Sequence, residues 1–171
     1  LRSEAYLHAR ARISQAYPVE VKARAVRAAS DACVSRGITA VHALEGGKLF
    51  GNEGAATVLR YLDRLPLDVT LFLQEMDAHF PRRLGFDHVG GCILIDGSIG
   101  SYTAAVAEPY VDRPGDRGLL YEKRRDLRRF VDETHRSGAQ LAFHAIGSRA
   151  IQMVLNAYED ALMRTPRFDH R

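Results

Sequence analysis

The sequence holds 171 residues, with 24 Lys and Arg side chains against 21 Asp and Glu and a net charge of +3. That length suits a single domain that buries roughly 70% of its unfolded surface. The mild charge, with no block of one sign, argues against nucleic-acid binding. No apolar run approaches the roughly 20 residues that a membrane span needs, and no signal peptide is visible.

The cysteine content indicates the redox environment. Cys33 and Cys92 form no CxxC motif, and they predict reduced thiols in a cytoplasmic protein rather than a disulfide framework. Leu1 is not an initiator Met, and the first residues already have a helical pattern. We therefore expect the chain to come from a longer protein.

The first half of the chain alternates between helical and strand patterns. A helix over residues 4–16 should stop before Pro18, because a residue preceding proline avoids the helical region. A second helix over residues 19–36 has Gly37 as its stop. β-branched side chains predict a strand over residues 38–44. The other expected elements of this half are a helix over residues 53–64 and a strand over residues 67–73.

The second half contains a short apolar run, residues 92–96, that predicts a buried strand with Cys92, Leu94 and Asp96 on one face. Residues 97–121 are rich in Gly, Pro and Asp and are too long for an ordinary connection, which predicts a lid or binding loop. The other expected elements are helices over residues 78–84 and 126–137, a strand over residues 140–145, and a helix from a Ser148 cap to about residue 164.

Strand and helix therefore alternate four times, which predicts an α/β fold with a parallel sheet and right-handed crossovers. Parallel sheets place their chemistry at the carboxyl ends of the strands. Imidazole, carboxylate and thiolate at such ends are the ligands of a zinc-like ion, which lowers the pKa of bound water enough for attack on a carbonyl. The predicted strand ends offer His42, Glu45, Gln74, Glu75, Asp77, Cys92, Asp96 and His144.

Each candidate also has an ordinary structural interpretation, since no His-x-His or His-Glu-x-x-His spacing is present. His42 fits a hydrogen-bonded rim residue, and Cys92 fits a small buried hydrophobe. Asp96 could tie down its own turn by accepting amide hydrogens from Ser98 or beyond. Glu45 fits a solvated loop acid. The Gly-Ser run at residues 97–101 could cradle an anion on its backbone amides, although it lacks the GxGxxG and P-loop patterns.

Three sequence blocks resemble the amidohydrolase-3 (YtcJ-like) branch of the metal-dependent amidohydrolases. They are GITAVHALEGG, DGSIGSYTAAVAEPYVDRPGDRGLLY and HAIGSRAIQMVLNAYEDAL, in the order that the branch shows. The resemblance implies a (β/α)8 TIM barrel with one or two divalent ions, usually zinc, that hydrolyses amide or related C–N bonds. Against that pattern, residues 1–171 look like a partial barrel, one segment that runs from the second strand to the helix after the fifth.

The resemblance also implies roles for particular residues. His144 matches the metal-ligand His of the fifth strand. Cys92 falls where many members carry a Lys that becomes carboxylated and bridges two metals, which a thiol cannot do. Either Cys92 ligates as a thiolate, or Glu45 supplies the bridging carboxylate, or the parent protein binds a single ion. Ser148 replaces the acid of the common HAIGDRA block.

The expected function is therefore metal-dependent hydrolysis of a small amide-type substrate, with this segment inactive by itself. Asp96 is the catalytic candidate, and the metal candidates are His144, Cys92 and Glu45. The substrate-binding candidates are His42, Ser98, Ser101 and Arg149. The open strand edges of a half barrel also predict self-association. The alternative is a non-catalytic α/β module that binds a small anion at the turn from Gly97 to Ser101.

Overall fold

The computed structural model describes residues 8–9, 12–13, 16–47 and 60–167. The chain forms two compact units, Leu1–Glu75 and Met76–Arg171. The helices predicted over residues 4–16 and 53–64 lie largely outside the described residues. Within the first of these ranges the structure describes residues 8–9, 12–13 and 16, all of them helical. Within the second it describes residues 60–61, which are helical, and the 3-10 turn η1 at Leu62–Arg64.

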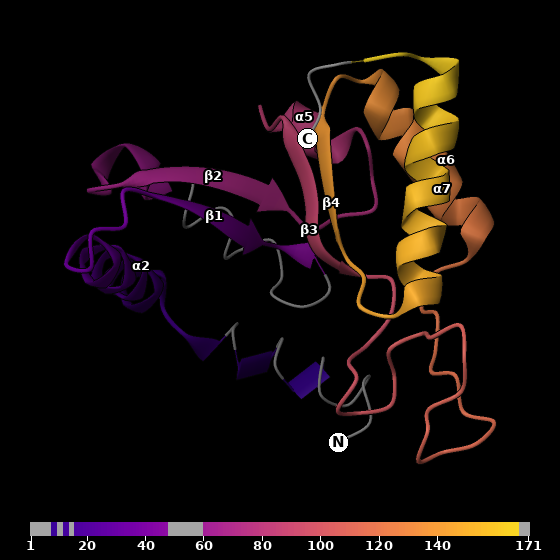
Figure 1. The fold of residues 1–171 in the computed structure, drawn as a ribbon. Helices are drawn as coiled ribbons and strands as arrows, with labels where there is room; N and C mark the ends of the chain where they lie inside the picture. Colours follow the sequence, from indigo (N-terminus) through magenta and orange to yellow (C-terminus); the bar gives the residue numbers. More distant parts are fainter. Residues whose placement is uncertain (1–7, 10–11, 14–15, 48–59, 168–171) are drawn as a thin grey trace. The chain divides into compact units, whose positions relative to one another are not determined.

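The first unit contains the helix α2, Val19–Val34 (Figure 1). The helix begins directly after Pro18, whose carbonyl accepts the N–H groups of Val21 and Lys22 at 3.1 and 3.2 Å. Gly37 follows its end with a φ of 78°, a conformation that favours glycine. The predicted helix over residues 19–36 is confirmed to within two residues.

Two parallel strands complete the described part of the first unit. β1, Ala40–Glu45, pairs with β2, Asp68–Leu73, in a register that runs from Ala40 opposite Asp68 to Glu45 opposite Leu73. β1 begins two residues later than predicted, because the N–H of Ile38 donates to the carbonyl of Cys33 and so belongs to the exit from α2.

The second unit is built on another parallel pair, β3, His88–Leu94, and β4, Gln140–His144. The prediction of a strand over residues 92–96 was wrong in its bounds. β3 starts earlier and includes Gly90, where a Cβ would overlap the carbonyl oxygen of Ala142. The strand ends at Leu94, so Asp96 lies beyond it and does not share the strand alternation of Cys92.

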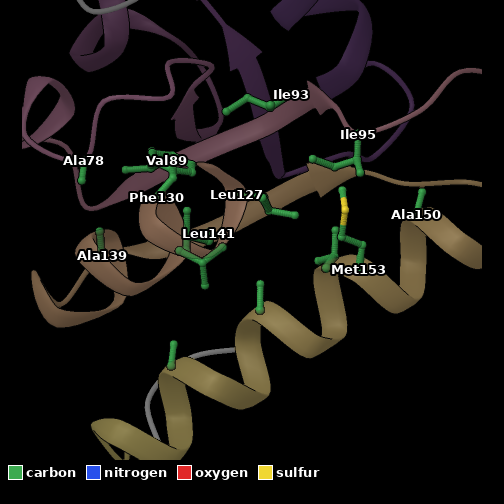
Figure 2. Packing of buried hydrophobic residues seen from close by; sticks show 14 of the residues in the cluster. Ala78, Val89, Ile93, Ile95, Leu127, Phe130, Ala139, Leu141, Ala150 and Met153 are labelled. Atoms are coloured by element: carbon green, nitrogen blue, oxygen red, sulfur yellow. The ribbon is translucent and has the colours of Figure 1, made fainter. Parts of the chain in front are cut away.

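Two helices cover this pair, α6, Arg124–Arg136, and α7, Ser148–Arg164, which lie side by side next to β4 (Figure 1). Their buried faces enclose one apolar core with the strands. Figure 2 shows Met153 reaching from α7 towards Ile95, which is fully buried. Alanines on α7 allow the close approach of the helix. The larger side chains of this core are Val89, Ile93, Ile95, Leu127, Phe130, Val131, Leu141, Met153 and Val154.

A short helix, α5, Phe80–Arg83, precedes β3. The Asp77 carboxylate accepts the N–H groups of His79 and Phe80 at 2.8 and 3.1 Å, and so holds the chain at the start of α5. Residues 97–121 form a long irregular connection, as their length and composition predicted, with an isolated bridge between Tyr110 and Arg113. Their role as a lid or binding loop stays a prediction. In the described part of the chain, every helix is too short or too polar to span a bilayer.

The core predicts a clear difference between two leucine substitutions. Leu127→Ala should lower the free energy of unfolding by about 2–5 kcal/mol, because Leu127 is fully buried and its loss leaves a cavity. Leu155→Ala, at a side chain on α7 that is 55% exposed, should change it by less than about 0.5 kcal/mol. Urea denaturation measures both values, and equal losses would contradict this core.

Candidate active site at the ends of β3 and β4

The imidazole of His144 and the thiol of Cys92 lie together near the carboxyl ends of their strands. His144 is the last residue of β4 and pairs with Leu94, two residues after Cys92 on β3. The Cys92 Sγ lies 4.0 Å from the His144 Nδ1. The prediction that parallel strand ends bring these two groups to one place is therefore confirmed by the geometry.

A backbone carbonyl fixes which ring nitrogen of His144 carries the proton. The His144 Nε2 lies 3.0 Å from the carbonyl oxygen of Gly97. A carbonyl only accepts hydrogen bonds, so Nε2 is the donor and the neutral ring has its lone pair on Nδ1. That lone pair faces the Cys92 sulfur, which makes Nδ1 the available ligand atom of the ring.

Asp96 lies two residues beyond β3 and is completely buried. Its Oδ2 accepts the N–H groups of Ala105 and Gly147 at 2.8 and 2.7 Å, and its Oδ1 accepts the N–H of Ile146 at 2.9 Å. Asp96 thus ties down backbone beyond Ser98, at Ala105, as expected, and it also holds the turn after β4, which was not expected. The N–H of Ser98 donates instead to the Thr103 hydroxyl. This environment favours a structural role over the predicted catalytic one.

Hydroxyl groups gather on the turn that follows Asp96. The Ser101 Oγ lies 2.8 Å from the Ser98 Oγ and 2.5 Å from the Thr103 Oγ1. Both serines are exposed, so their hydroxyls can reach a polar ligand. The backbone amides are less available, because the N–H groups of Gly97 and Ser98 donate to the carbonyl and hydroxyl of Thr103. This pattern counts against an anion cradle at residues 97–101.

The start of α7 differs from its prediction at Ser148. The residue preceding the helix is Gly147, and no side chain caps the helix. The Ser148 hydroxyl instead accepts the N–H of Ala107, so the predicted capping role was wrong. Arg149 has an exposed side chain on the first turn of α7, and its N–H donates to the Ala105 carbonyl at 2.8 Å.

The first unit contains the other two predicted site residues. His42 is exposed on β1, and its ring lies 5.4 Å from the ring of Phe72 on β2. Glu45 ends β1 and is half-buried, and this burial raises the pKa of its carboxyl above the ordinary value. At the adjacent end of β2, the Gln74 side chain is buried and donates to the Leu44 carbonyl at 3.0 Å.

The donor set at His144 and Cys92 fits part of a metal site. An imidazole nitrogen with a free lone pair and a cysteine sulfur are both ligands that zinc prefers. No cluster of three or more His, Cys, Asp or Glu side chains placed to hold an ion occurs among the residues that the structure describes. The two atoms can therefore supply two ligands, and a four-coordinate ion needs others besides them.

Sequence reasoning missed the carbonyl of Gly97, which orients His144, and the reach of Asp96 to the turn after β4. Neither leaves a distinct signal in a sequence, since one is a backbone atom and the other depends on which segments lie side by side. The spacing of DGS and HAIG blocks marks the two segments but not their contact.

The whole chain, residues 1–171, matches the family model described as "Amidohydrolase family". An Arabidopsis thaliana protein, "Protein LONG AFTER FAR-RED 3", is 38% identical over 85 residues, which cover 49% of this chain and 15% of that protein. A Bacillus subtilis (strain 168) protein, "Putative amidohydrolase YtcJ", is 36% identical over 77 residues, 45% of this chain and 15% of that protein.

Two solved structures share the fold, both described as uncharacterized metal-dependent hydrolases. The structure from Pyrococcus furiosus has a TM-score of 0.71 at 24% identity. The matched region covers 85% of this chain and 32% of the Pyrococcus furiosus chain. The structure from Pyrococcus horikoshii OT3 has a TM-score of 0.67 at 24% identity. The matched region covers 84% of this chain and 31% of the Pyrococcus horikoshii chain. The chain thus spans about a third of these structures, and the predicted fold class, an α/β partial TIM barrel, is confirmed.

The close packing around Gly97 predicts a second pair of variants. Gly97→Ala should lower the free energy of unfolding by about 1–3 kcal/mol, because its Cβ would overlap the Thr103 side chain and lie 2.8 Å from the Tyr121 hydroxyl. Gly100→Ala, three residues along the same turn, places its Cβ where nothing lies within 4 Å and should be nearly neutral. Chemical denaturation separates the two, and a neutral Gly97→Ala would refute the packing.

Burial raises the pKa of the Cys92 thiol above its ordinary value. Because the thiolate is the reactive form, alkylation of Cys92 by iodoacetamide in the metal-free protein should increase with pH along a curve displaced to higher pH than in the urea-unfolded chain. Mass spectrometry of the Cys92 peptide follows the rate. A curve that coincides with that of the unfolded chain, or lies at lower pH, would contradict the burial.

Proposed function

The chain belongs to the amidohydrolase family, and on that premise we propose that the protein containing it is a metal-dependent hydrolase that cleaves the C–N bond of a small amide-type substrate. The observation that carries the proposal is the pairing of the His144 Nδ1 with the Cys92 Sγ at the carboxyl ends of adjacent parallel strands. That edge of a parallel barrel is where its enzymes bind substrate.

We propose that His144 and Cys92 hold one divalent ion, which we expect to be zinc. Nδ1 already presents its lone pair, whereas Cys92 gives up its proton to bind as a thiolate. The Gly97 carbonyl, which accepts the proton on Nε2, keeps the ring turned towards the ion. When bound, the ion lowers the pKa of a water molecule so that it can attack a carbonyl carbon near neutral pH.

Of the three explanations for a thiol in place of the family's Lys, the contact between Cys92 and His144 supports ligation by Cys92 itself. A thiolate is a soft ligand with a single negative charge, and it suits a site that holds one zinc ion. The carboxylated Lys of the family, in contrast, bridges two metals. A bridging role for Glu45 stays a prediction. We propose that the segment alone is inactive, because its described residues provide two ligands at this position.

Substrate contacts are proposed for exposed polar groups. Ser98 and Ser101 lie in the turn that begins at Gly97, whose carbonyl orients His144, and their hydroxyls lie 2.8 Å apart. They can hydrogen-bond the polar groups of an amide. Arg149, at the exposed start of α7, could supply a positive charge for an acidic substrate group. The role of His42 in substrate binding, self-association through strand edges and a cytoplasmic location stay predictions from the sequence.

Metal binding tests this proposal directly. In the intact protein, His144→Ala and Cys92→Ser should each weaken zinc binding ~10-fold or more, because each removes a ligand. The cobalt-substituted protein should show a thiolate-to-cobalt absorption band in the near ultraviolet, which Cys92→Ser abolishes. Competition with a chromophoric chelator measures the zinc affinity.

Cys33→Ser is the matched control, since Cys33 is the other free cysteine and lies on α2. It should leave both the affinity and the cobalt band unchanged. The proposal fails if Cys92→Ser keeps the band, or if zinc binds His144→Ala as tightly as the wild-type protein.

A further inference from the structure

We propose that Asp96 is a positioning residue for His144, and that the buried carboxylate acts through the turn after β4 and the carbonyl of Gly97. The inference rests on the proposed function for its consequence in metal binding, but its structural part stands on the hydrogen bonds alone. No substrate contact is assigned to Asp96.

Three consecutive residues hold three different parts of the His144 region. The N–H of Ile95 donates to the His144 carbonyl at 2.9 Å, which fixes the backbone of the histidine itself. Asp96 accepts the N–H groups of Ile146 and Gly147, which fixes the second and third residues after the strand. The Gly97 carbonyl accepts the Nε2 proton, which fixes the ring. The Asp96 carboxylate is the middle contact of the three.

The same carboxylate also sets the position of Gly97. Its third bond, to the N–H of Ala105, anchors the long loop nine residues after Asp96, at the end of the turn that begins at Gly97. Within that loop the N–H of Gly97 donates to the Thr103 carbonyl at 3.1 Å. The Ala105 carbonyl in turn accepts the N–H of Arg149 at 2.8 Å. The loop and the start of α7 are thus joined twice. The Asp96 carboxylate links Ala105 to Gly147, and the Ala105 carbonyl bonds Arg149 directly.

Burial separates this role from acid or base catalysis. Asp96 has no exposed surface, and each of its carboxylate oxygens already accepts a backbone N–H. A group that exchanges protons with a substrate has to reach it within hydrogen-bond distance, directly or through one water. The geometry therefore assigns Asp96 to holding His144, with Cys92 4.0 Å from the ring nitrogen that Asp96 helps to place.

Asp96→Asn is the critical variant because it keeps the shape of the side chain. Its amide oxygen can replace one carboxylate oxygen, but its NH2 group then faces a backbone N–H, and at least one of the three bonds is lost. In the metal-free intact protein, 15N NMR of the histidine rings should show His144 as the Nε2-protonated form in the wild type and as a mixture of both tautomers in Asp96→Asn. Cobalt affinity should fall ~10–100-fold, the range seen when a group that orients a metal ligand is removed.

Asp116→Asn is the matched control, because Asp116 lies in the same loop and its carboxylate accepts a single backbone N–H, that of Gly118, at 3.0 Å. It should leave the His144 tautomer and the cobalt affinity at wild-type values. A simple loss of stability in the loop would affect both variants, whereas a positioning role affects the His144 signal in Asp96→Asn alone.

The outcomes distinguish this inference from the proposed function. If Asp96→Asn keeps the wild-type tautomer and affinity, the positioning role is overturned, while a cobalt-thiolate band in the wild type would still support the hydrolase. If the tautomer shifts but no cobalt binds at Cys92, the positioning role holds and the metal proposal fails. If Asp96→Asn does not fold, hydrogen exchange in the wild type decides. Cobalt should then slow exchange of the Ala105, Ile146 and Gly147 amides, because coupling is reciprocal, and unchanged exchange would overturn the inference.

Discussion

The three hydrogen bonds of the Asp96 carboxylate are the constraint on which the second unit depends. A buried carboxylate is costly unless its oxygens are matched by donors, and here three backbone N–H groups from two separate segments provide them. The segments are the first part of the long loop, at Ala105, and the turn between β4 and α7. Because both are held by one side chain, the loop, the strand end and the helix start take fixed positions together.

The order of the elements could be predicted from the sequence because local signals agree with tertiary structure. Pro18 and Gly37 bound α2, and β-branched runs mark β1 and β2 to within two residues. The prediction failed at β3, where Gly90 and the neighbouring Gly91 have positive φ values and yet belong to the strand. The place of Gly90 in the strand depends on the close approach of Ala142 on β4, which no local pattern reveals.

The candidate site could be predicted in part for the same reason. The rule that parallel strands carry function at their carboxyl ends, together with the resemblance to a family, was enough to select His144 and Cys92. The assignment of Asp96 to catalysis came from its place after a strand, but the structure shows that its oxygens face backbone amides. A carboxylate at such a position can serve the site without touching a substrate, and only the three-dimensional structure distinguishes the two roles.

The separation of Cys92 and His144 along the chain has a thermodynamic consequence. The two residues are 52 positions apart, and they meet because β3 and β4 pair. An ion shared by both atoms would therefore act as a cross-link that closes a long loop, and it would bind the folded chain far more tightly than the unfolded one. Its concentration would set part of the protein's resistance to unfolding, through mass action rather than through any additional packing.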